Sequence, residues 1–142
     1  MIKHLIHTAI AMSTGTILFA QGIQFIEEDW DKALTTAKQE NKIIFLDAYT
    51  TWCGPCKMLA ARVFPQADVG TFHNANFINA KVDMEKGQGI ELAKKYNVRA
   101  YPTLLYINPD GEVVHTIVGA VGSKEPIEGG RQALNPLLND KG

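Results

Sequence analysis

The residues best suited to chemistry in this chain are its two cysteines, Cys53 and Cys56, which are separated by two residues. A pair at this spacing can close a disulfide across one helical turn and open it again, which is thiol–disulfide exchange. Pro55 between them fixes φ in a first helical turn, where its missing N–H costs nothing. If Cys53 begins a helix, unpaired backbone N–H groups and the helix dipole favour its thiolate. We therefore expect Cys53 to have the lower pKa of the two thiols.

Two other interpretations of the cysteine pair stay open from the residues alone. A structural disulfide would close so short a loop that it removes little entropy from the unfolded chain. A structural zinc site needs four ligands, but the chain has only these two cysteines, and His73 and His115 lack ligand spacing. We instead expect His73 on a helix surface and His115 exposed on a strand. We expect no metal and no organic cofactor.

A single carboxyl interrupts the apolar segment that leads to the cysteines. Residues 43–49 form a nearly continuous apolar run, which predicts a buried central strand, and Asp47 lies within it. A carboxylate in a core strand is costly unless it is paired or protonated. Asp47 is therefore either a functional buried acid with a raised pKa or a surface residue at the end of the strand.

Three segments of the chain together resemble the thioredoxin family. Trp52-Cys53-Gly54-Pro55-Cys56-Lys57 is similar to its active-site motif, Tyr101-Pro102-Thr103 looks like its cis-proline segment, and Val118-Gly119-Ala120 looks like its last-strand glycine. The similarity covers about residues 30–123. It implies the thioredoxin fold, an α/β fold with a mixed central sheet and helices on both faces. Residues 64–77 are more similar to the C-terminal thioredoxin-like domain of the bacterial membrane thiol-disulfide interchange reductase, and to small secreted proteins built like it.

The resemblance also implies an activity and a role for each site residue. The protein would be a protein-disulfide reductase in which Cys53 attacks a substrate disulfide, Cys56 resolves the mixed disulfide, and Asp47 takes the proton from Cys56. The expected substrate-binding residues are Trp52, Gly54, Pro55, Tyr101 and Pro102, with Lys57 and Lys81 in supporting positions. The family places its lysine four residues before a strand-end Asp, whereas Asn79 stands there in this chain. Whether Lys81, two residues on, pairs with Asp47 therefore stays open.

Two rival functions use the same residues differently. The protein could be a disulfide oxidase or isomerase, or a non-catalytic binding module that uses the fold as a docking surface. The Gly-Pro dipeptide between the cysteines resembles that of reducing thioredoxins, and a binding module has no need of two cysteines together with Asp47 and Pro102. A reductase implies protein thiol or disulfide substrates and, if it is exported, a membrane reductase as electron donor.

The rest of the chain must position these residues, and its apolar periodicity predicts how. Helices are expected over residues 27–41, 54–64, 67–76, 90–97 and 123–139, and strands over 22–26, 43–49, 77–84, 103–108 and 112–118. The helix after the cysteines should be straighter than in plain thioredoxins, because Ala61 replaces a kinking proline. The last helix should be weak, since Gly129 and Gly130 together cost about 2 kcal/mol relative to alanine and Pro136 interrupts it. We expect it to fray after Asn135.

The first 20 residues have the pattern of a secretory signal peptide. Lys3 is followed by a mostly apolar run over residues 8–19 and by the small residue Ala20 at the cleavage position. We expect residues 21–142 to form one thioredoxin-like domain that is periplasmic or secreted, although a buried N-terminal helix or a disordered leader would also fit. The apolar run is short and interrupted, which disfavours stable membrane insertion. A net charge of −1 gives no indication of a nucleic-acid partner, and we expect a monomer.

Overall fold

A mixed five-stranded sheet forms the centre of the molecule. The structure, a computed structural model, describes residues 21–119 and 121–135. The strands are β1 (Ile26–Glu27), β2 (Ile43–Tyr49), β3 (Phe77–Asp83), β4 (Thr103–Ile107) and β5 (Val113–Val118), in the order β1-β3-β2-β4-β5. The first three strands in this order are parallel, and β4 is antiparallel to both β2 and β5. The architecture is the predicted α/β class with a mixed sheet.

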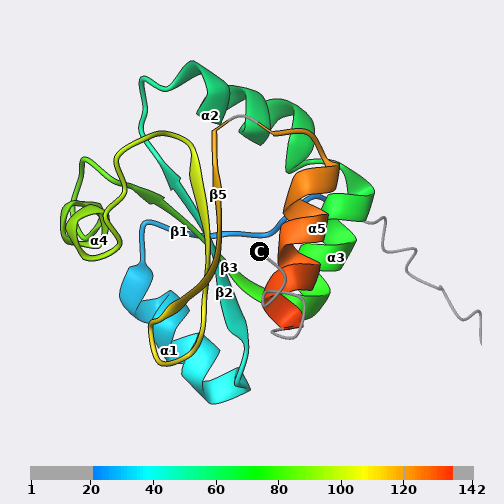
Figure 1. Ribbon diagram of the computed structural model, residues 1–142, viewed down its shortest axis with the longest axis horizontal. Helices are drawn as coiled ribbons and strands as arrows, with labels where there is room; N and C mark the ends of the chain where they lie inside the picture. The colour runs from blue at the N-terminus through cyan, green and yellow to red at the C-terminus, as the bar shows by residue number, and fades with distance from the viewer. Residues whose placement is uncertain (1–20, 120, 136–142) are drawn as a thin grey trace, which may run out of the picture.

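Helices cover both faces of this sheet (Figure 1). The helices α1 (Trp30–Glu40) and α4 (Gly89–Lys95) pack on one face. The other face carries α2 (Gly54–Met58), the π-helical turn η1 (Leu59–Val63), α3 (Ala67–Asn76) and α5 (Lys124–Leu134). The side chains of β2 alternate between the two layers, as a strand requires. Leu46 packs in the α1 layer and Phe45 in the layer of η1, α3 and α5.

The first helix begins later than the sequence pattern predicts. Residues 26–27 pair with β3, and Glu28 has a φ of 54°, a left-handed conformation that cannot continue a helix. Asp29 then caps α1 by accepting a hydrogen bond from the Lys32 N–H at 3.0 Å. Glu27, Glu28 and Asp29, which the prediction of a helix over residues 27–41 includes, therefore belong to a strand, a turn and a cap.

The helix that follows the cysteines is not the straight α-helix that we expected. α2 ends at Met58 and is followed by η1, in which the Phe64 N–H donates to the Leu59 carbonyl five residues earlier at 2.9 Å. This wider turn contains Ala61 and directs Leu59, Val63 and Phe64 into the core. The prediction of a straighter helix is wrong, because a π-turn replaces the proline kink as the irregular feature.

The glycine pair in α5 serves close packing. A Cβ on Gly129 would lie 2.7 Å from the Ile117 side chain, and one on Gly130 would lie 2.5 Å from the Phe72 ring. Both glycines are buried, so they allow α5 to approach β5 and α3 more closely than a larger residue could. The predicted extension to residue 139 and the fraying after Asn135 lie outside the described residues.

Both histidines that we expected at the surface pack into the protein. His73 is fully buried, with Nδ1 2.9 Å from the Val69 carbonyl oxygen and Nε2 3.2 Å from the Tyr106 hydroxyl. Burial lowers the pKa of His73 to about 4. His115 is half-buried against Tyr106, with ring centroids 5.9 Å apart, and burial lowers its pKa as well. The surface placement was wrong because α5 covers this part of the sheet.

Candidate active site

The two cysteines lie at the point where β2 gives way to α2. Cys53 is the N-cap of α2, and it forms a disulfide with Cys56, with the two Cα atoms 5.3 Å apart. Both residues are buried, and the Cys53 sulfur accepts a hydrogen bond from the Cys56 backbone N–H at 3.1 Å. This N–H is one of the donors that a helix start leaves without an intrahelical partner. The same donor would stabilise a thiolate on Cys53 once the disulfide opens.

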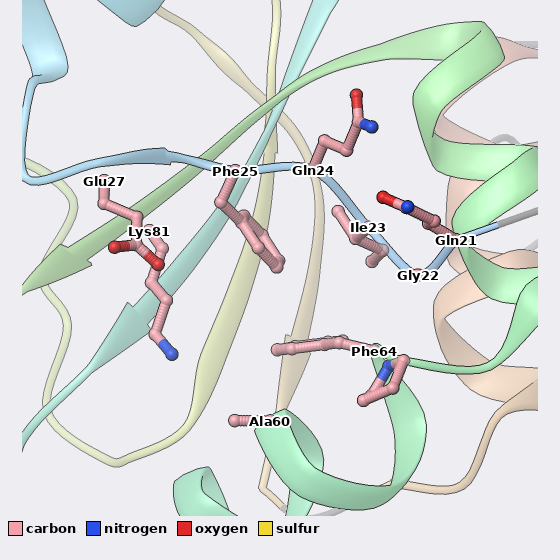
Figure 2. A pocket seen from close by; sticks show the side chains of 10 residues that line it. Gln21, Gly22, Ile23, Gln24, Phe25, Glu27, Ala60, Phe64 and Lys81 are labelled. Carbon is pink, nitrogen blue, oxygen red and sulfur yellow. The ribbon is translucent and has the colours of Figure 1, made fainter.

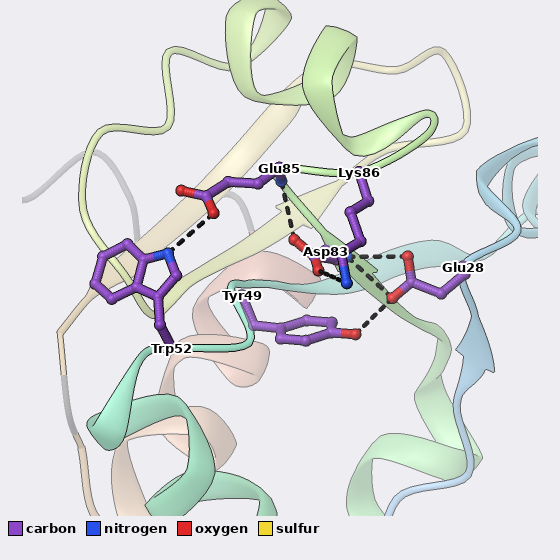
Figure 3. Close-up of polar contacts among 6 residues, drawn as sticks. All are labelled: Glu28, Tyr49, Trp52, Asp83, Glu85 and Lys86. Carbon is purple, nitrogen blue, oxygen red and sulfur yellow. Dashed lines mark hydrogen bonds and ion pairs between the residues drawn. The ribbon is translucent and has the colours of Figure 1, made fainter.

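An aromatic contact joins the cysteine segment to the proline segment. The rings of Trp52 and Tyr101 meet edge to face, with centroids 6.0 Å apart, and the Trp52 indole N–H donates to Glu85 at 2.9 Å (Figure 3). The Tyr101–Pro102 peptide bond is cis, as the resemblance implied. Because Trp52 precedes Cys53 and Tyr101 precedes Pro102, this contact brings the disulfide and the proline to the same end of the sheet.

The surface around the disulfide is open. Trp52 is 64% exposed, and Gly54, Pro55 and Lys57 are exposed. In the part of the chain that the structure describes, nothing beyond the neighbouring residues and the backbone of its own helix lies within 4 Å of where a Gly54 Cβ would stand. Pro102 is buried and accepts a hydrogen bond from Gly119 N–H at 2.9 Å, at the end of β5. The residues that we predicted to bind substrate therefore border the buried sulfurs, which suits docking of a protein chain.

Asp47 is buried, so the alternative that it lies at the surface is wrong. Its side chain is 1% exposed, and its Oδ1 atom has no hydrogen-bond partner among the residues that the structure describes. Burial raises the pKa of Asp47 from its ordinary value of 3.8 to about 7, and the nearby charge of Lys81 offsets only part of this rise. Asp47 alternates with Leu46 and so points to the same side of the sheet as Phe45, the side on which η1 packs.

Lys81 lies beside Asp47 without forming an ion pair with it. The two residues are in register on the neighbouring strands β3 and β2. Among the residues that the structure describes, no ion pair joins them. The Lys81 ammonium instead lies over the Tyr49 ring, 4.8 Å from its centroid, and its side chain extends toward the helical segment of Ala60 (Figure 2). Asn79, at the family's usual lysine position, donates to Asn74.

A second polar network lies behind the site, and no sequence pattern predicts it. The Tyr49 hydroxyl donates to Glu28 at 2.7 Å, and the Glu28 carboxylate accepts from the Asp83 N–H at 3.0 and 3.1 Å (Figure 3). Burial and this hydrogen bond raise the pKa of Tyr49. The sequence pattern placed Glu28 in a helix and Tyr49 at the end of a strand, and no local signal linked them.

The site and the fold define a thiol–disulfide oxidoreductase. A helix-capping cysteine in a two-residue disulfide, a buried acid and a cis-proline on a mixed α/β sheet together provide for thiol–disulfide exchange. In the described ranges, no group of three or more His, Cys, Asp or Glu side chains is arranged to hold a metal ion, and no helix has the length and apolarity to cross a membrane.

Comparison with known proteins identifies the family. A family model described as "Thioredoxin" matches residues 22–129, so the chain belongs to the thioredoxin family, and it is a protein-disulfide reductase by class. It is 38% identical to a thioredoxin H-type of Oryza sativa subsp. indica over 66% of this chain and 71% of that protein. It is also 38% identical to a thioredoxin of Echinococcus granulosus over 68% of this chain and 85% of that protein.

One solved structure is more similar in sequence than these relatives. It is a solution structure from Bacteroides thetaiotaomicron with a provisional description as a disulphide-isomerase. The two sequences are 48% identical, the match covers 82% of this chain and 97% of that chain, and the TM-score is 0.71. The thioredoxin fold that the sequence predicts is therefore confirmed.

Proposed function

We propose that this protein is an exported reductase of protein disulfides in which Cys53 attacks, Cys56 resolves and Asp47 accepts a proton. One observation carries the assignment of the attacking sulfur. The Cys53 sulfur is the N-cap of α2 and accepts the Cys56 N–H, so a negative charge on Cys53 is stabilised without any rearrangement. Cys56 lies within the first turn of the helix and is the buried residue of α2.

The reaction proceeds in two exchange steps. The Cys53 thiolate attacks one sulfur of a substrate disulfide, which forms a mixed disulfide and releases the other substrate sulfur as a thiolate. The Cys56 thiolate then attacks the Cys53 sulfur, closes the Cys53–Cys56 disulfide and releases the second substrate sulfur. Two electrons and two protons pass from the dithiol to the substrate, which leaves as two thiols.

Asp47 supports the second step. A carboxyl with a pKa of about 7 is partly ionised at neutral pH and can accept a proton from a thiol, directly or through water. The direction of its side chain, toward the face that α2 and η1 cover, is the direction this role requires. Trp52 and Tyr101 provide an apolar surface on which the substrate chain rests.

A trapping experiment tests the two cysteine assignments. Cys56→Ser should hold substrate proteins as mixed disulfides through Cys53, whereas Cys53→Ser should trap none and should not reduce insulin. Trapping by Cys53→Ser in place of Cys56→Ser would reverse the assignment. Insulin reduction by a protein that lacks both cysteines would overturn the mechanism.

Export is supported by the signal-peptide pattern of residues 1–20, and it implies that a membrane reductase returns electrons to Cys53–Cys56. Mass spectrometry of the exported protein should give a chain that begins at Gln21. An intact Met1 in exported material would contradict cleavage after Ala20.

Disulfide isomerisation is a second candidate, and the provisional description of the Bacteroides thetaiotaomicron structure favours it. An isomerase needs Cys53 to attack and leave again before Cys56 resolves. Under one glutathione buffer, the protein should then restore scrambled ribonuclease faster than it reduces insulin, and Cys56→Ser should retain that activity. If Cys56→Ser abolishes both activities, the reductase assignment holds and the isomerase assignment fails.

A further inference from the structure

We infer that Tyr49 is a positioning residue of the site, whose ring holds the Lys81 ammonium and so keeps this charge from pairing with Asp47. This inference rests on the proposed role of Asp47 only for its consequence in turnover. The inference itself concerns the position of the Lys81 side chain and the pKa of Asp47, and both can be measured on the oxidised protein.

The backbone would allow the ion pair that is missing. Asp47 and Lys81 are in register on β2 and β3, and neighbouring strands lie about 4.8 Å apart. Side chains in register on neighbouring strands project from the same face, and a lysine is long enough to reach a carboxylate there. The Lys81 ammonium nevertheless lies 4.8 Å from the centroid of the Tyr49 ring. A cation over an aromatic face is attracted to it, so the ring competes with Asp47 for this charge.

The Tyr49 ring is itself held in place. Its hydroxyl donates to Glu28 at 2.7 Å, and the Glu28 carboxylate accepts from the Asp83 N–H (Figure 3). The Glu28 N–H in turn donates to the Lys81 carbonyl at 2.9 Å. Glu28 adopts its left-handed φ of 54° at the turn that makes these contacts possible. These hydrogen bonds hold the Tyr49 ring beside β3, the strand that carries Lys81.

The position of Lys81 determines how basic Asp47 is. A close opposite charge lowers the pKa of a carboxyl by about 1–3 units. Lys81 of β3 is the charge that acts on Asp47, while Tyr49 of β2 stays neutral in this range because its pKa is raised, and β4 places uncharged Leu104 in register with Asp47. On the helical side, Cys56 is in the disulfide, and Lys57, which lines the same pocket as Cys56 and Lys81, is exposed to solvent. With Lys81 held on the ring, burial dominates and Asp47 stays a base suited to neutral pH.

Lys81 also lies near the resolving cysteine. Tyr49, Cys56, Ala60 and Lys81 line a common pocket of about 200 Å³. The ammonium that the ring withholds from Asp47 is therefore placed on the side of the site where Cys56 gains negative charge when it loses its proton. The contact between Lys81 and the Tyr49 ring therefore keeps Asp47 basic and also places a positive charge near Cys56.

Titration of Asp47 in oxidised protein with ¹³C-labelled carboxyls tests the inference. Tyr49→Leu removes the ring, so Lys81 is free to pair and the pKa of Asp47 should fall by about 1 unit or more. Tyr49→Phe is the matched control, because it keeps the ring and should leave the pKa close to that of the wild type. Lys81→Met should raise the pKa, and Tyr49→Leu in the Lys81→Met background should change it no further. An unchanged pKa in Tyr49→Leu, with a raised pKa in Lys81→Met, would overturn the inference.

A measurement on the wild type covers the case in which Tyr49→Leu does not fold. Protons on the Lys81 Cε should be shifted upfield by the ring current of Tyr49, and ordinary shifts there would overturn the inference. Turnover separates this result from the proposed function. If the pKa of Asp47 falls in Tyr49→Leu and the acid limb of insulin reduction moves with it, both stand. If the pKa falls and the limb does not move, the positioning by Tyr49 stands and the role of Asp47 as base fails.

Discussion

Replacing Asp47 by asparagine should reverse the pH dependence of stability in the oxidised protein. Two buried groups have pKa values shifted in opposite directions: the pKa of Asp47 rises from 3.8 to about 7, and that of His73 falls from 6.5 to about 4. Asparagine removes the first contribution and leaves the second. The disulfide keeps the cysteines from titrating in the same range.

The sign of each contribution follows from which state binds the proton. Above its unfolded pKa, Asp47 keeps a proton in the folded state that the unfolded chain has released, so stability falls as pH rises through about 7. His73 behaves in the opposite way: below pH 6.5 the unfolded chain binds a proton that the folded state excludes, so stability is lost as pH falls toward about 4.

The magnitudes nearly cancel in the wild type. Between about pH 5 and about pH 8, Asp47 lowers the free energy of unfolding by about 3 kcal/mol and His73 raises it by about 2 kcal/mol. The wild type should therefore lose only about 1 kcal/mol over this range. Asp47→Asn should instead gain about 2 kcal/mol over the same range. His115, whose pKa burial also lowers, adds a gain of the same sign to the wild type and to every variant, so it leaves the differences between their profiles unchanged.

Urea unfolding of oxidised protein without reductant, at several pH values from about 5 to about 8, measures these slopes. The comparison uses the change with pH within each variant, because the cost of burying an asparagine amide does not depend on pH in this range. His73→Leu is the matched variant, and its stability should fall by about 3 kcal/mol over the same interval. Parallel profiles for Asp47→Asn and the wild type would refute the reasoning.

Three further outcomes are expected. Asp47→Ala should reduce insulin more slowly than the wild type between about pH 6 and about pH 9, a range that spans thiol titration, and wild-type kinetics would remove Asp47 from the mechanism. Gly130→Ala should lower the free energy of unfolding in urea by about 1–3 kcal/mol through overpacking, whereas Gly54→Ala meets open space and should not show this loss. Iodoacetamide should label Cys53 before Cys56 in the reduced protein, and the reverse order would exchange their roles.

The features that could be predicted from the sequence are those encoded by neighbouring residues. β2 follows from a continuous apolar run, and the disulfide follows from two cysteines one helical turn apart. The predicted burial of Asp47 is confirmed. It could be predicted because a carboxyl inside a continuous apolar strand is enclosed together with its neighbours. The roles of the site residues in catalysis stay predictions.

The features that the sequence does not predict depend on how helices and strands distant along the chain pack against one another. The sequence pattern places His73 on a helix surface, because only the packing of α3 against the sheet and α5 shows that this side of the helix is enclosed. From the sequence, Gly129 and Gly130 indicate only a loss of helix propensity, since the rings and side chains that need their space come from α3, β3 and β5. A propensity scale contains no term for such contacts.

The position of Lys81 shows the same limit at the site itself. Its place two residues before Asp83 and its register with Asp47 follow from the strand pattern, but the register is equally compatible with an ion pair and with the observed contact to Tyr49. The contact to Tyr49 is favoured because the Tyr49 hydroxyl is hydrogen-bonded to Glu28, which lies in the turn between β1 and α1. A residue more than 50 positions from Lys81 along the chain thus controls the electrostatics of the acid beside the disulfide. The active-site motif supplies the sulfurs, but the ionisation of Asp47 is set by contacts outside the motif.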